Sequence, residues 1–299
     1  MKVAKGYVLS ALLFFYSLNA QAADDSYQLN LSGLGSVKTD SSENETRSPA
    51  LGLQVFFKPV VNDPQQAFDQ HEFIQRASNL YLTVMPTEIN DSTYKTKTQL
   101  SNTNAALTYY QGDMFAKLAY SKGSGDTKLK STSTRLYDLE SDASTYAAGY
   151  YLYPNSHLMV IVDKTSISAT TDSIWLPATP DDVTTKTGLT SKTLWNLDSQ
   201  QALCLELSLR SVHHESSSKH QNSESDVSVK FYPVPKAYVQ LQWIHNQGEY
   251  KDITGNTSML GAGYAFTPRL SLYAAYLNFT ATGSSNDSHT TLLAGNYRF

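Results

Sequence analysis

The chain has 299 residues, of which 17% are charged, with a formal net charge of −4 and one cysteine. A single cysteine excludes an internal disulfide, and the near balance of charge gives no sign of nucleic-acid binding. Tyrosines are numerous at 20, and the low share of charged residues suits a protein with little ordinary water-facing surface.

The N-terminus has the features of a secretory signal peptide. Two lysines precede an apolar core from Val8 to Leu18, and Ala20-Gln21-Ala22 fits the small-x-small cleavage rule. This core is shorter than the about 20 apolar residues that a membrane-spanning helix needs. We therefore predict a cleaved signal peptide over 1–22 and an exported chain over 23–299, with an uncleaved anchor helix as the alternative.

Segments of alternating polarity recur along the remaining chain, as in amphipathic β-strands. The clearest is ALCLELSLR at 202–210, which puts four leucines on one face and Cys204, Glu206, Ser208 and Arg210 on the other. Helical periodicity is weak, apart from a turn or two at 69–77. The pattern predicts fourteen strands, at 27–37, 48–58, 72–85, 98–110, 114–122, 143–153, 157–170, 189–196, 201–213, 224–232, 237–246, 257–266, 270–281 and 289–299.

The connections between these predicted strands alternate between short and long. The short ones, such as QGD at 111–113 and PVPK at 233–236, contain the Gly, Pro, Asn or Asp residues of tight turns. Short turns at one end and long polar loops at the other are typical of outer-membrane barrels. We predict a single all-β domain, a transmembrane up-and-down antiparallel β-barrel of about 14 strands, with 12 or 16 as alternatives. The long loops at 123–142 and 171–188 are the candidates to constrict its lumen.

The final segment, SHTTLLAGNYRF, is predicted to close the barrel by pairing with the first strand. An open edge within a membrane would leave unpaired N–H and C=O groups at a high cost in free energy. Alternation directs Leu293, Tyr297 and Phe299 toward lipid, and the two aromatic rings suit the membrane interface. A C-terminal aromatic after alternating apolar residues resembles the closing-strand signal of bacterial outer-membrane barrels. That resemblance implies outer-membrane lipids and the barrel-insertion machinery as partners.

A second stretch, LGLQVFFKPVVNDPQQAFDQHEFIQRASNLYLTV at 51–84, is more particular. It resembles a family of porins from Gram-negative gammaproteobacteria, in which an aromatic strand end and a Pro-Val step lead through a polar loop to a Phe-containing segment. The resemblance implies an outer-membrane pore. The connection within this stretch is an exception, because it is long although it lies at the end of the barrel where the turns are short. A family-specific element or a miscounted strand would explain its length. The matching residues are Phe56, Phe57, Pro59, Val60, Phe73 and Ala77.

Polar side chains that point inward would line the pore, and their charges have mixed signs. Opposed acidic and basic groups would create a transverse field that passes small polar solutes. Alternatively, neighbours such as Glu206 and Lys230 simply pair with each other. A ring of a single sign, which would set ion selectivity, is not visible. The predicted pore-lining residues are Gln54, Lys117, Asp163, Glu206, Arg210, Asp226, Lys230, Gln240, Gln242 and Arg298.

Other chemistry has weaker support in the sequence. His213, His214 and His220 form a cluster, but adjacent strand residues face opposite sides, which disfavours a metal site. A loop that gains charge at mildly acidic pH, and so narrows the pore, fits these histidines better. Cys204 is interpreted as a small residue that fills the lumen rather than as a nucleophile. We predict no catalytic residue, metal or cofactor.

These observations predict passive diffusion of small hydrophilic solutes or ions through an aqueous lumen in the outer membrane. A barrel of this size leaves such a lumen unless loops fold into it. One alternative is an occluded structural or adhesive barrel that acts through its outer loops. A barrel hydrolase is another, and it would need Ser, His and acidic residues near one rim, yet no serine lies in a G-x-S-x-G elbow.

Overall fold

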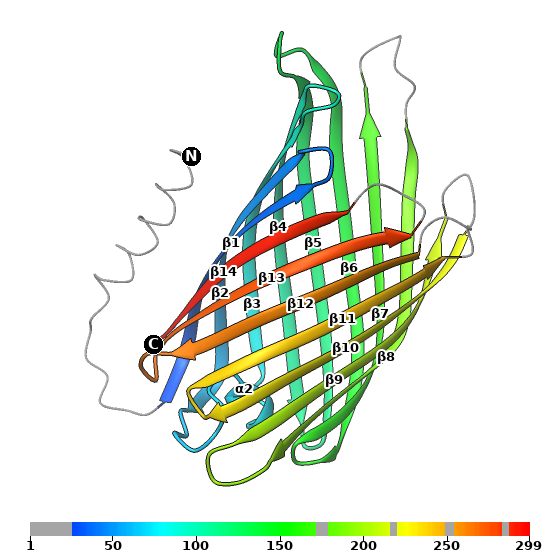
Figure 1. The fold of residues 1–299 in the computed structure, drawn as a ribbon. Helices are drawn as coiled ribbons and strands as arrows, with labels where there is room; N and C mark the ends of the chain where they lie inside the picture. The colour runs from blue at the N-terminus through cyan, green and yellow to red at the C-terminus, as the bar shows by residue number, and fades with distance from the viewer. Residues whose placement is uncertain (1–25, 172–178, 216–219, 249–253, 283–286) are drawn as a thin grey trace.

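The computed structural model describes residues 26–171, 179–215, 220–248, 254–282 and 287–299. These residues form a closed barrel in which every strand pairs antiparallel with its neighbours in sequence, and the last strand pairs with the first (Figure 1). The predicted up-and-down barrel of about 14 strands is therefore confirmed. The predicted signal peptide lies outside the described residues.

The strands are β1 (Ser26–Asp40), β2 (Glu45–Val61), β3 (Asn79–Asp91), β4 (Thr96–Gln111), β5 (Met114–Leu129), β6 (Arg135–Tyr153), β7 (Ser156–Thr170), β8 (Thr179–Asn196), β9 (Ala202–His214), β10 (His220–Val234), β11 (Ala237–Gly248), β12 (Thr254–Ala265), β13 (Leu270–Thr282) and β14 (Ser288–Arg298). A one-turn helix, α2 (His71–Ile74), lies between β2 and β3, within the predicted helical stretch. Among the described residues, no helix has the length and apolar character needed to cross a membrane.

Alternation along each strand gives the wall two chemically different faces. On β9, Leu207 and Leu209 are 40% and 64% exposed, whereas Cys204 and Ser208 are buried. The outer face therefore carries large apolar side chains, and the inner face carries small and polar ones. Further exposed side chains of this kind include Leu51, Leu82, Val84, Leu118, Tyr146, Val160, Leu189, Leu241, Leu260 and Tyr276.

The ring closes between β1 and β14. The backbone N–H of Phe299 donates to the C=O of Leu29 at 2.8 Å. Leu293 is exposed on the outer face, and Arg298 is 6% exposed. The rings of Tyr297 and Phe299 contact each other, with 4.8 Å between their centroids. Because both edge strands are paired, the closed sheet has no free edge along this seam.

One side of the barrel is much taller than the other. Strands β5 to β8 extend well beyond the level at which β11 to β14 end (Figure 1), and β6 has 19 residues where β14 has 11. The predicted loop at 123–142 is therefore wrong, because β5 continues to Leu129 and β6 begins at Arg135. This segment extends the wall and does not fold into the lumen.

The second predicted constriction, at 171–188, is wrong in its second half for the same reason. Residues from Thr179 onward belong to β8, while 172–178 lie outside the described residues. Both segments are rich in Ser, Thr, Lys and Asp. Where both faces of a strand are exposed to water, neither face needs apolar side chains. The alternation of polar and apolar residues is then lost although the strand continues. The sequence pattern therefore ends before the strand does.

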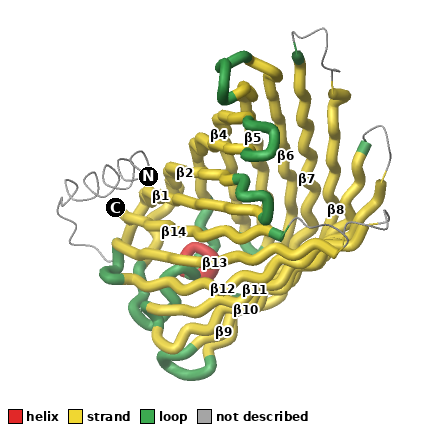
Figure 2. The backbone as a smooth tube through the Cα atoms, turned by 45° about the horizontal axis from the view of Figure 1, so that its top comes forward, coloured by secondary structure: helices red, strands yellow, loops and turns green. Residues whose placement is uncertain are grey.

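The connection between β2 and β3 turns into the barrel. We call residues 62–78 the plug segment; it contains α2 and lies within the ring of strands (Figure 2). Its Ala67, Phe68 and Phe73 share one buried cluster with residues of β5, β6 and β8 to β12. Contact with strands so far around the ring is possible only from the inside. Arg76 adopts a φ of 51°, a left-handed conformation that ends the short helix.

Candidate functional site: the lumen and its plug segment

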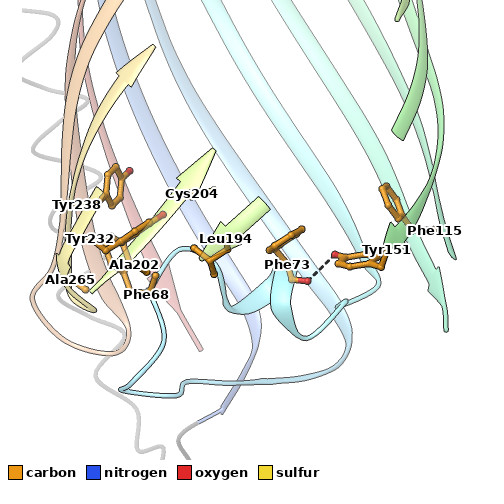
Figure 3. Packing of buried hydrophobic residues seen from close by; sticks show 11 residues of the cluster. Phe68, Phe73, Phe115, Tyr151, Leu194, Ala202, Cys204, Tyr232, Tyr238 and Ala265 are labelled. Carbon is orange, nitrogen blue, oxygen red and sulfur yellow. Dashed lines mark hydrogen bonds between the residues drawn. The ribbon is translucent and has the colours of Figure 1, made fainter. Parts of the chain in front are cut away.

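Two phenylalanines fix the plug segment to separate parts of the wall (Figure 3). The Phe73 ring packs on Tyr151 of β6, with centroids 5.5 Å apart, and the Tyr151 hydroxyl donates to the Phe73 carbonyl at 2.8 Å. Phe68 stacks on Tyr238 of β11 at 5.6 Å. Lys192 of β8 places its Nζ 4.6 Å from the centre of the Phe73 ring. The plug segment therefore spans the lumen at the short-turn end.

Asp69 forms charge-assisted polar contacts between the plug segment and the wall. Its carboxylate accepts from Lys230 Nζ at 2.8 Å and from the Tyr232 hydroxyl at 2.7 Å, both on β10. Such charge-assisted hydrogen bonds are stronger than neutral ones. Burial acts to raise the pKa of Asp69, but Lys230 and the hydrogen bonds outweigh it, and the pKa lies below its usual value. The docked segment therefore favours the ionised carboxylate.

Glu72, one helical turn away, has a different environment. Its carboxylate accepts from the Tyr27 hydroxyl at 3.5 Å and from Gln54 Nε2 at 3.2 Å, and both donors are neutral. None of the ion pairs found among the described residues includes Glu72. Burial raises its pKa above the usual value, although Arg298 nearby acts in the opposite direction. The docked segment therefore disfavours the ionised form of Glu72.

Charged residues gather on the inner face of β7 to β10, and we call this set the charged wall. Nearly all of them form ion pairs. Some of these pairs join strands that are not neighbours, which is possible because the side chains share the inner face. Asp226 differs, because both its oxygens accept from the Gln242 amide at 2.9 Å. The ion pairs are Lys192–Glu206 at 3.0 Å, Lys186–Glu224 at 2.8 Å, Arg210–Asp163 at 3.6 Å, Arg210–Glu224 at 3.7 Å and Lys230 with Asp69 of the plug segment at 2.8 Å.

The ten residues predicted to line a pore all lie on the inner face. Each is an even number of positions from a buried, inward-facing residue of its own strand, such as Phe115 or Cys204. Gln54 and Arg298 contact the plug segment. Gln54 Nε2 donates to the Glu72 carboxylate, and Arg298 Nη2 donates to the Phe68 carbonyl at 2.8 Å. Asp163, Glu206, Arg210, Asp226 and Lys230 belong to the charged wall. Gln240 donates to Ser228 Oγ at 2.9 Å, Gln242 binds Asp226, and Lys117 forms none of the ion pairs found among the described residues.

The suggested pairing of Glu206 with Lys230 does not occur. Glu206 pairs with Lys192, and Lys230 pairs with Asp69. Sequence reasoning missed Lys186, Lys192 and Glu224, since the predicted strands began too late to include Lys186 and gave no partner to the others. A longer eighth strand would have included Lys186, whereas Lys192 already lies within the predicted strand at 189–196. Asp69 and Glu72 carry no periodic signal that could have revealed them.

The histidines and the cysteine also have ordinary environments. His214 Nδ1 lies 2.9 Å from Thr184 Oγ1, and the side chain of His220 lies outside the described part of the chain. Within that part, no three His, Cys, Asp or Glu side chains are arranged to hold a metal ion. Cys204 is 1% exposed and belongs to the cluster that contains Phe68 and Phe73. It therefore lies in the buried cluster that the plug segment forms with the wall.

Solved structures of similar fold are outer-membrane barrels. The outer membrane protein Omp33 of Acinetobacter baumannii matches with a TM-score of 0.54 and 16% identity, over 92% of this chain and 99% of its own. The monoaromatic hydrocarbon channel CymD matches with a TM-score of 0.59 and 8% identity, over 91% of this chain and 89% of its own. At such identities the likeness establishes the fold. Neither protein-family models nor characterised protein sequences match this chain.

Proposed function

We propose that this protein is an outer-membrane channel for the passive diffusion of small hydrophilic solutes or ions. The observation that carries the proposal is a closed barrel with an apolar outer face and a charged, hydrogen-bonded inner face. A closed ring satisfies its backbone groups internally, as a lipid environment requires. The predicted signal peptide and the fold likeness to Omp33 and CymD support the same location.

The charged wall supports hydrophilic solutes. Its acidic and basic groups alternate and pair, so the described residues of the lumen form no single-sign ring of the kind that gives strong ion selectivity. CymD is described as a monoaromatic hydrocarbon channel. In the present chain, an apolar solute would have to pass Arg210, Glu224 and Asp226 and disturb their hydration. We therefore assign small polar solutes or inorganic ions, with mild selectivity.

The plug segment favours a second candidate, an occluded barrel that acts through its outer loops. Contacts of this segment reach β1, β6, β10, β11 and β14. A segment that touches so much of the ring narrows the lumen strongly. The two candidates differ in one property, which is whether current flows through the folded barrel.

Single-channel recording distinguishes the two candidates. The mature chain and a variant with residues 63–76 replaced by a Gly/Ser stretch of equal length would be reconstituted in planar bilayers. Discrete current steps from the variant, larger than those of the unmodified protein, are expected. Heat-modifiable gel mobility would show that both proteins are folded. Silence from both folded proteins would overturn the channel and leave the occluded barrel.

A further inference from the structure

We propose that the plug segment is a releasable gate, held against the wall by the Asp69 carboxylate and loosened by the Glu72 carboxylate. This inference rests on the proposed channel function and adds its regulation. The two acidic residues lie three positions apart on one segment, yet they act in opposite directions.

Release of the plug segment would leave the ring intact. The ladder between β2 and β3 runs from Glu45 with Asn90 to Phe56 with Asn79 and includes no residue of the segment. The Gln75 side chain joins the two ends of the segment by binding the backbone of Val61. Its Oε1 accepts from the Val61 N–H at 2.8 Å, and its Nε2 donates to the Val61 carbonyl at 2.6 Å. Undocking therefore breaks side-chain contacts and the backbone hydrogen bond from the Phe68 N–H to the Pro235 carbonyl at 3.0 Å, but no strand pairing.

The interface between the plug segment and the wall is also incompletely hydrogen-bonded. Buried oxygen atoms of Asn62, Gln66 and Gln70, and the Nδ1 atom of His71, have no protein partner among the described residues. Water satisfies such groups once the segment leaves the wall. The docked state thus lacks hydrogen bonds that the released state can form, which keeps docking reversible.

The electrostatic difference between the two carboxylates follows from their neighbours. Asp69 faces Lys230 and Tyr232, and removing its charge would leave the buried Lys230 ammonium without its partner. Glu72 faces neutral donors on Tyr27 and Gln54 and forms no ion pair among the described residues, and the charge of Arg298 nearby offsets only part of its desolvation. An unpaired buried charge costs free energy, and a paired one costs much less.

Cys204 supplies a native reporter for release. It is the single cysteine of the chain, and it is buried in the cluster formed with Phe68 and Phe73. When the plug segment undocks, the thiol faces the water-filled lumen. The rate at which a small water-soluble maleimide modifies folded protein in lipid vesicles therefore measures how often the segment is released. This measurement does not depend on whether the barrel conducts.

The test compares three charge-neutralising substitutions in the plug segment at neutral pH. Asp69→Asn should speed labelling of Cys204 by more than about tenfold, because a buried ammonium is left unpaired. Glu72→Gln should slow labelling several-fold, because it removes an unpaired charge, while its Oε1 can accept from Gln54 Nε2 and its amide can donate to the Tyr27 hydroxyl oxygen. Asp63→Asn is the matched control and should leave the rate unchanged, since its side chain accepts from the Gln65 N–H and forms none of the ion pairs found among the described residues. The Gly/Ser variant at 63–76 should give the fastest rate.

Several results would overturn the gate. One is equal labelling of Asp69→Asn and Asp63→Asn, and another is faster labelling of Glu72→Gln. Slow labelling of the Gly/Ser variant would show that something other than the plug segment buries Cys204. If labelling follows the expected order while no variant conducts, the proposed channel function fails and the release of the segment stands. Heat-modifiable mobility of each variant excludes unfolding as the cause of fast labelling.

Discussion

Gly149 of β6 permits the closest side-chain contact in the cluster around the plug segment. A Cβ atom at this position would lie 2.3 Å from the Phe115 ring. Gly149→Ala should displace Phe115 from Tyr151 and lower the free energy of unfolding by about 1–3 kcal/mol. Urea unfolding of the protein in lipid vesicles measures this change. Gly35→Ala, which meets no atom within 4 Å, is the control and should not destabilise the barrel.

His71 and Glu72 predict pH responses of opposite sign. Burial lowers the pKa of His71 and Arg298 lowers it further, although the hydrogen bond to the Asp63 carbonyl and the charge of Asp63 act in the opposite direction. Acidification below the ordinary value of about 6.5 therefore adds a proton to the released state first and favours release. Because the pKa of Glu72 is raised, acidification toward its ordinary value of about 4.3 favours docking instead.

Single substitutions separate these two contributions to plug docking. In Glu72→Gln, acidification from neutral pH to about pH 5 should speed Cys204 labelling, because His71 then dominates. In His71→Gln, the same change should slow labelling, because Glu72 then dominates. Each rate is divided by that of the Gly/Ser variant at the same pH, which cancels the pH dependence of the reagent. A pH response of the same sign in both variants would contradict this assignment.

At the scale of elements, we expect the charged wall to set the ion selectivity of the proposed channel. Arg210 pairs with both Asp163 and Glu224. Arg210→Met would leave these carboxylates in excess, so the reversal potential under a KCl gradient should shift toward greater cation preference. Lys97→Met removes the same charge from the outward row of β4, where Lys97 pairs with Glu88. This control should leave the reversal potential unchanged, and an equal shift in both variants would exclude a special role for the wall.

The strands could be predicted and the plug segment could not, for a physical reason. Alternation is a local property, and in β9 it separates Leu207 from Glu206 without any knowledge of the fold. Short turns then impose antiparallel neighbours. The contact of Asp69 with Lys230 joins residues 161 positions apart, and no local sequence pattern in the plug segment predicts this contact. The long connection at 62–78 was the only sign that this end of the barrel is unusual.

At the scale of the whole molecule, we expect the tall side to be dispensable for closure. Strands β11 and β12 close their part of the ring with 12 residues each, whereas β5 has 16 and β6 has 19. Shortening the β5–β6 hairpin by a few residues on each strand around 130–134 should leave the protein folded and its conductance nearly unchanged. Heat-modifiable mobility and single-channel recording measure this. Loss of folding would show that the extension supports the ring.

The seam between β1 and β14 has a consequence for how the molecule is made. The hydrogen bond from Phe299 to Leu29 joins positions separated by almost the whole described chain. A ribosome synthesises Leu29 long before Phe299, so the ring cannot close until β14 has been made, and every earlier intermediate presents two unpaired strand edges. Closing such a long loop is slow, and open edges invite aggregation in the meantime. We therefore expect this chain to need chaperones that cover its strand edges until β1 and β14 pair.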